Sequence, residues 1–60
     1  MSEYRVSGTV YEASSSGDYE VADIEIALFA KNEVEASELA QALIDDKFYL
    51  NLNDIMVEKT

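Results

Sequence analysis

Apolar and polar residues alternate along the first part of the chain, from Tyr4 to Tyr11. The two alternating sets are Tyr4, Val6, Gly8 and Val10 on one side, and Arg5, Ser7, Thr9 and Tyr11 on the other. A period of two in a segment rich in Val, Thr and Tyr predicts a half-buried β-strand. Gly8 inside this strand indicates a bulge or a place where the helix approaches closely.

A second alternating stretch extends from Tyr19 to Phe29. The residues expected to face the core are Ile24, Ile26 and Leu28, and those expected to face solvent are Asp23 and Glu25. The segment before it, Glu12–Asp18, contains serines, glycine and aspartate without periodicity, which is typical of a hairpin loop. We expect Gly17 and Asp18 to form the tight turn.

The period changes to that of a helix between Ala30 and Ile44. Five small or apolar residues recur at i, i+3, i+4, i+7 and i+8, and they are Ala36, Leu39, Ala40, Leu43 and Ile44. This spacing places all five on one stripe of an α-helix that faces the core. Asn32, with Glu35 three residues later, resembles a capping box at the start of this helix.

The end of the chain is less regular. Phe48, Leu50 and Leu52 alternate with polar residues, but Ile55 and Val57 follow out of phase. A bulge or short turn near Asn53–Asp54 would return the apolar residues to the core face. We therefore expect an irregular segment at 48–52 and a third strand at 53–59.

The element order predicts an α+β fold of one small domain spanning residues 1–60. The first two strands should form an antiparallel hairpin, and a right-handed crossover through the helix should place the third strand beside the first. The predicted architecture is a two-layer ββαβ unit. Its three-stranded antiparallel sheet has the order 2-1-3, one helix packs on one face, and the other face stays open.

Charge is the strongest feature of the composition. Thirteen Asp and Glu residues stand against four Lys and Arg residues, which gives a net charge of −9 in 60 residues. Such a chain repels nucleic-acid phosphates and anionic lipid, so we expect neither direct nucleic-acid binding nor membrane binding. The same charge fits docking on a basic protein surface, and it also fits a role in solubility or adaptation to high salt.

Catalytic chemistry has little support in this sequence. The chain contains no Cys or His, which excludes the common zinc sites and His-based catalysis. The carboxylate pairs lack the spacing of a calcium-binding loop, and so short a chain has little room for a ligand pocket. We therefore expect no enzyme activity, no metal and no cofactor. A chain without a transmembrane run or signal peptide is expected in the cytoplasm.

The helix start also carries a family resemblance. Its pattern Ala30-x-Asn32-x-x-Glu35-Ala36-x-Glu38-Leu39-Ala40 resembles the helix start of the small inhibitors of bacterial RNA polymerase made by T7-like bacteriophages. The loop Glu12-Ala13-Ser14-Ser15, the strand start Tyr19-Glu20-Val21, the length and the element order are similar as well. The resemblance covers about residues 4–45. It implies a protein that binds host RNA polymerase, or another nucleic-acid enzyme, in the cytoplasm of the host cell.

One departure from that family shifts attention to the acidic residues. The family grips the polymerase with arginines of its third strand, whereas Asn51–Lys59 offers only Lys59 here. The candidate partner-binding residues are Arg5, Asp23, Glu25, Glu33, Glu35, Glu38 and Lys59. The alternatives are an oligomerisation or accessory domain of a salt-adapted proteome, with a homodimer through the open sheet face or the second strand, and a DNA-mimic inhibitor of a host defence nuclease.

Overall fold

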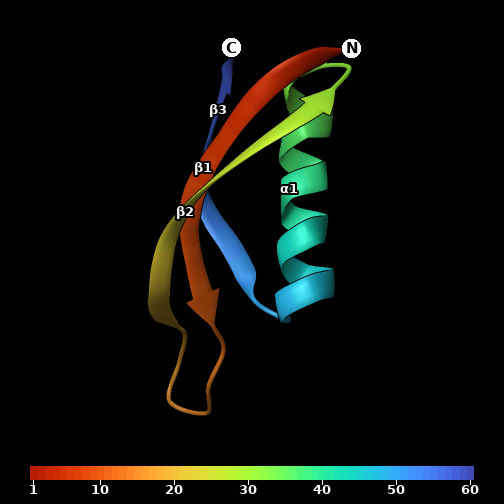
Figure 1. Cartoon of the computed structure of the whole chain (residues 1–60). Helices are drawn as coiled ribbons and strands as arrows, with labels where there is room; N and C mark the ends of the chain where they lie inside the picture. The colour runs from red at the N-terminus through yellow and green to blue at the C-terminus, as the bar shows by residue number, and fades with distance from the viewer.

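A computed structural model describes all 60 residues of the chain. The four elements are β1 (Ser2–Glu12), β2 (Tyr19–Ala30), α1 (Glu33–Phe48) and β3 (Asn51–Lys59). Figure 1 shows α1 lying along one side of a twisted sheet, with the β1–β2 hairpin extending beyond the helix. Because β1 begins at Ser2, the sheet includes the chain almost from its first residue.

The sheet has the order β2-β1-β3, and β1 pairs antiparallel with both of its neighbours. The predicted α+β fold, with its 2-1-3 strand order and one covered face, is therefore confirmed. Positions of the same parity on paired strands share a face. The apolar set that contains Val6 thus lies under the helix, and the set that contains Arg5 lies on the open face.

Eight residues form the buried core, contributed by all four elements. They are Tyr4, Val6, Val10, Ala30, Ala36, Ala40, Ile44 and Leu52. The expectation that Leu39 and Leu43 also belong to this core is wrong, because their side chains are 45% and 40% exposed. Small alanines at the contact let the helix sit close to a narrow sheet. The two leucines, displaced around the helix, then lie at the margin.

The cap at the start of α1 is confirmed. Asn32 has an extended backbone, and its Oδ1 accepts a hydrogen bond of 2.8 Å from the Glu35 N–H. The Glu35 carboxylate in turn accepts from the backbone N–H of Lys31 at 3.1 Å, one residue earlier than in a standard capping box. The bond from the Glu35 N–H satisfies a donor of the first turn, where helical partners are missing, and the bond from the Lys31 N–H satisfies a donor just before the cap.

The helix continues further than its spacing predicted. It ends at Phe48 rather than near Ile44, so the expected irregular segment at 48–52 is wrong. The chain reverses at Tyr49, whose φ of 57° is left-handed and whose N–H donates to the Asp45 carbonyl at 3.0 Å. This residue ends the helix in the way that glycine usually does, and β3 starts directly afterwards at Asn51.

The predicted irregularity at Asn53–Asp54 is present as a bulge in β3. Asp54 has a φ of 55°, and the pairing register between β1 and β3 shifts between Ser7 and Thr9. The bulge returns Ile55 and Val57 to the half-buried side, as the phase change required.

The hairpin turn lies slightly earlier than expected. Ser14 and Gly17 exchange backbone hydrogen bonds of 3.1 and 3.2 Å around Ser15 and Ser16. Gly17 has a φ of 116°, so it supplies the unusual backbone of the turn, whereas Asp18 lies outside it.

Candidate protein-binding surface

The open face of the sheet combines polar and acidic side chains from all three strands. The register places Thr9 opposite Asp23 and Ser7 opposite Glu25 on β2, and Arg5 opposite Glu58 on β3. Neither the helix nor a loop covers this face, because α1 packs on the other side (Figure 1). It is therefore an open surface and not a pocket.

Arg5 is the cation that the middle strand β1 contributes to this face, and two carboxylates flank it. Its Nε lies 3.4 Å from Glu25 Oε1, and its Nη1 lies 3.8 Å from Glu58 Oε1. At least half of each of these side chains is exposed, so the pairs add little stability. Because two carboxylates face one guanidinium, the three side chains together remain negatively charged.

A second group of acidic residues surrounds Tyr11 towards the hairpin end of the same face. Partial removal from water raises the pKa of the Tyr11 hydroxyl, and the negative charges of Asp54 and Glu20 raise it further. Asp23 accepts a hydrogen bond of 2.9 Å from the Thr9 hydroxyl, which holds its carboxylate near this group. The carboxylates of Asp54, Glu20 and Asp23 therefore add negative charge to this end of the open face.

The helical candidates lie in the other layer of the fold. Glu33 and Glu35 belong to the first turn of α1, where they face the positive end of the helix dipole. Glu35 is also engaged in the cap, through its bond from the Lys31 N–H. Glu38 follows one turn later on the exposed side of the helix. The structure thus separates these three glutamates from Asp23 and Glu25.

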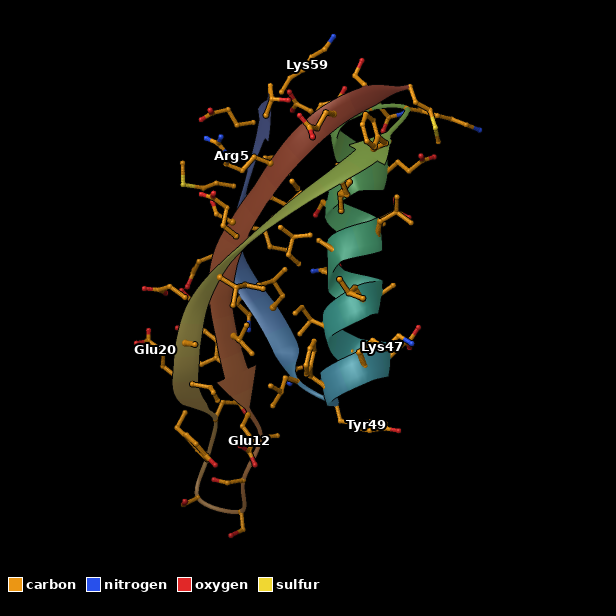
Figure 2. All side chains as sticks on the ribbon, in the orientation of Figure 1. Arg5, Glu12, Glu20, Lys47, Tyr49 and Lys59 are labelled. Atoms are coloured by element: carbon orange, nitrogen blue, oxygen red, sulfur yellow. The ribbon has the colours of Figure 1, made fainter.

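Lys59 lies at the end of β3, opposite Tyr4, on the helix-facing side of the sheet. Figure 2 shows Lys59 at the same end of the molecule as Arg5, whereas Lys47 lies at the other end near Tyr49. The seven sequence candidates therefore form three groups. The open-face group is Arg5, Asp23 and Glu25, the helical group is Glu33, Glu35 and Glu38, and Lys59 stands apart.

The sequence did not reveal an apolar groove between β2 and the end of α1. Its volume is about 160 Å³, and its lining is entirely apolar: Val10, Val21, Ala22, Ile24, Ile44, Phe48 and Leu50. Phe48 is 60% exposed and Val21 is 49% exposed, although both line this groove. The groove is not apparent from the sequence because the pattern there predicts an irregular segment at 48–52 that includes Phe48, whereas Phe48 is the last residue of α1.

A second, polar hollow of about 580 Å³ lies between α1 and the start of β3. Its polar lining residues are Asp18, Gln41, Asp45, Asn51 and Asn53. No group of three or more Asp or Glu residues in the chain has a geometry that could hold a metal ion. The single helix is too short and too polar to cross a membrane.

Comparisons with known proteins found no match, since no family model, no curated protein and no solved structure matches the chain.

Proposed function

We propose that this chain is a small acidic protein that binds a basic surface of a nucleic-acid enzyme and inhibits it, with bacterial RNA polymerase as the specific target. The observation that carries the proposal is the charge of the open sheet face. Its cation, Arg5, is already flanked by Glu25 and Glu58, so Asp23 and the acidic group around Tyr11 are not balanced by any neighbouring base.

An open, negatively charged face is suited to a basic surface that normally holds nucleic acid. Charge complementarity of this kind steers association and sets orientation, and both effects weaken as salt rises. The resemblance of the helix start to the phage inhibitors of RNA polymerase supports the choice of that enzyme. The binding residues in this proposal are Asp23 and Glu25, with the helical glutamates in a minor role because they lie in the other layer.

The test compares two variants that remove the same charge. Asp23→Asn with Glu25→Gln removes two negative charges from the open face, and Glu33→Gln with Glu38→Gln removes two from the helix. Labelled protein is titrated with purified bacterial RNA polymerase, and run-off transcription is measured in parallel. We expect the sheet variant to bind about tenfold more weakly or worse, which corresponds to at least about 1.4 kcal/mol. The helix variant should change the Kd by less than about threefold.

Two results would contradict this proposal. The first is unchanged transcription and no binding by the unmodified chain at low salt. The second is equal weakening by both variants, because that would indicate a non-specific effect of net charge. If duplex DNA of any sequence prevents binding, the protein occupies the nucleic-acid channel of the polymerase. The same titration with a DNA-cutting nuclease then shows which of the two enzymes the protein prefers.

A further inference from the structure

The two edges of the sheet differ in how well another strand could pair with them. On β3, the bulge at Asp54, with its φ of 55°, interrupts the edge. On β2, the pairing with β1 is regular from Ala22 to Ala30, and its one irregularity lies before this segment. A regular edge strand presents a row of backbone N–H and C=O groups without partners, which is a template for an added strand.

The helix-facing side of this β2 edge is incompletely covered. Ile24, Ile26 and Leu28 are only half-buried, whereas Val6 on the neighbouring strand is fully buried. Beside the start of this segment lies the apolar groove under the exposed ring of Phe48. An added strand would place every second side chain over this apolar side and remove it from water.

The other side of the same edge has a different chemistry. Asp23 and Glu25 stand on the open face, followed by Ala27 and by Phe29, which is 64% exposed. The side chains of an added strand that point to this face would lie beside two carboxylates. Charge complementarity therefore selects cationic residues at those positions and apolar residues at the alternate ones.

We infer that the outer edge of β2, over Ala22–Leu28, binds an extended segment of a partner protein in which cationic and apolar side chains alternate. The inference deepens the proposed function and rests on its protein-binding role. It specifies the kind of segment that a basic partner would contribute, and it adds backbone pairing to the attraction of charges.

A second copy of this chain fits the same edge poorly. When two β2 strands pair antiparallel near this segment, the carboxylates at 23 and 25 of one copy lie opposite or diagonal to those of the other. Like charges directly across a sheet are destabilising, and each copy also carries a net charge of −9. These two carboxylates thus disfavour self-pairing while they favour a cationic segment.

The probe is a synthetic eight-residue peptide that alternates arginine and valine. Its control has the same composition, with all valines in one block and all arginines in the other. Each peptide is titrated into the isotope-labelled full chain, and amide chemical shifts and hydrogen exchange are recorded. We expect the alternating peptide to bind at least tenfold more tightly, to shift amides of Ala22–Leu28, and to slow their exchange. Equal binding of both peptides, or shifts confined to β3, would overturn the inference.

A pair of charge reversals on the open face completes the test. Asp23→Lys lies on β2, and Glu58→Lys lies on the far strand β3. We expect Asp23→Lys to weaken binding of the alternating peptide at least tenfold, and Glu58→Lys to change its Kd less than threefold. The amide spectrum confirms that both variants fold. Equal effects would mean that net charge and not the β2 edge governs binding.

Sedimentation and the polymerase assay separate the remaining outcomes. A dimer that protects the β2 amides without peptide would overturn the inference in favour of a second copy. If the chain binds polymerase but not the alternating peptide, the edge site is refuted and the proposed function stands. If it binds the peptide but not polymerase, the edge site stands and the choice of polymerase is refuted.

Discussion

Gly8 of β1 lies against the backbone of Asn53, where β3 bulges towards it. A Cβ atom on Gly8 would stand 2.8 Å from the Asn53 carbonyl oxygen and 2.9 Å from a methyl carbon of Leu52. The register between the two strands shifts at this point, so the bulge occupies the space that a side chain on Gly8 would need. The bulge in turn brings Ile55 and Val57 to the core side.

Gly8→Ala should therefore destabilise the protein. Because the nearest obstacle is a backbone oxygen, relief requires a shift of β3 itself, and we expect a loss of about 1–3 kcal/mol in the free energy of unfolding. Urea denaturation measures this loss. Ser7→Ala, on the neighbouring half-buried position, serves as the control and should change stability by less than about 0.5 kcal/mol. Comparable losses in the two variants would show that the contact at Gly8 has no special cost.

Replacement of Tyr49 by glycine should stabilise the protein. Tyr49 has a left-handed φ of 57° and is 87% exposed, so its side chain contributes little packing to offset the backbone cost. Glycine adopts this conformation freely, and we expect a gain of about 0.5–1 kcal/mol. The matched control is Ala42→Gly at an exposed position inside the helix, which should lose about 1 kcal/mol. A loss for Tyr49→Gly in the same thermal unfolding experiment would mean that the ring makes a stabilising contact.

Ile44 and Leu39 should differ in their cost of truncation. Ile44 is 5% exposed and belongs to the core, so Ile44→Ala should cost about 2–5 kcal/mol. Leu39 is 45% exposed at the margin, and Leu39→Ala should cost about 1 kcal/mol or less. Both substitutions introduce alanine, the best helix former, so a loss of helix propensity does not account for the difference. Equal costs in urea denaturation would place Leu39 in the core after all.

Local patterns were sufficient for the strands, the cap and the bulge, and the right-handed crossover rule then gave the strand order. Alternation identified the strands because a half-buried strand has a period of two, and the phase change after Leu52 located the bulge. Gly8 was correctly associated with a close approach, although the approaching element is β3 and not the helix. These features depend on neighbouring residues, which is why the sequence reveals them.

Features that depend on how the layers meet were not predictable in this way. The apolar stripe of α1 includes Leu39, but only the position of the helix on a three-stranded sheet decides that this residue stays at the margin. The helix end at Phe48 depends on Tyr49 accepting a left-handed backbone, for which tyrosine gives no signal. The separation of Glu33 from Asp23 into different layers likewise follows from tertiary structure.

Asn32→Ala should weaken the start of the helix. The Asn32 side chain accepts from the Glu35 N–H at 2.8 Å, and alanine leaves this donor without its partner. We expect a loss of about 1 kcal/mol, while Asn32→Asp should retain the bond and most of the stability. Gln41→Ala, at an exposed helical position, is the control and should be close to neutral. An unchanged midpoint of thermal unfolding for Asn32→Ala would show that water replaces the cap without cost.

Tyr11 should make stability depend on pH in the alkaline range. Partial desolvation, followed by the charges of Asp54 and Glu20, raises its pKa in the folded protein above the ordinary value of 10.0. The unfolded chain then releases the phenolic proton first. The stability due to Tyr11 is thus fully present below about pH 10 and is lost as the pH rises through the higher folded pKa.

Urea denaturation at a series of pH values, with phenolate absorbance recorded in parallel, measures this effect. The pKa of Tyr19 is also raised, first by its hydrogen bond with Glu12, so Tyr19→Phe is used as the background. On that background, Tyr11→Phe should reduce the loss of stability above about pH 10. Asp54→Asn keeps a residue that tolerates the left-handed backbone but removes the charge, and it should lower the pKa of Tyr11. If Asp54→Asn leaves the phenolate titration unchanged, the negative field around Tyr11 does not arise from Asp54.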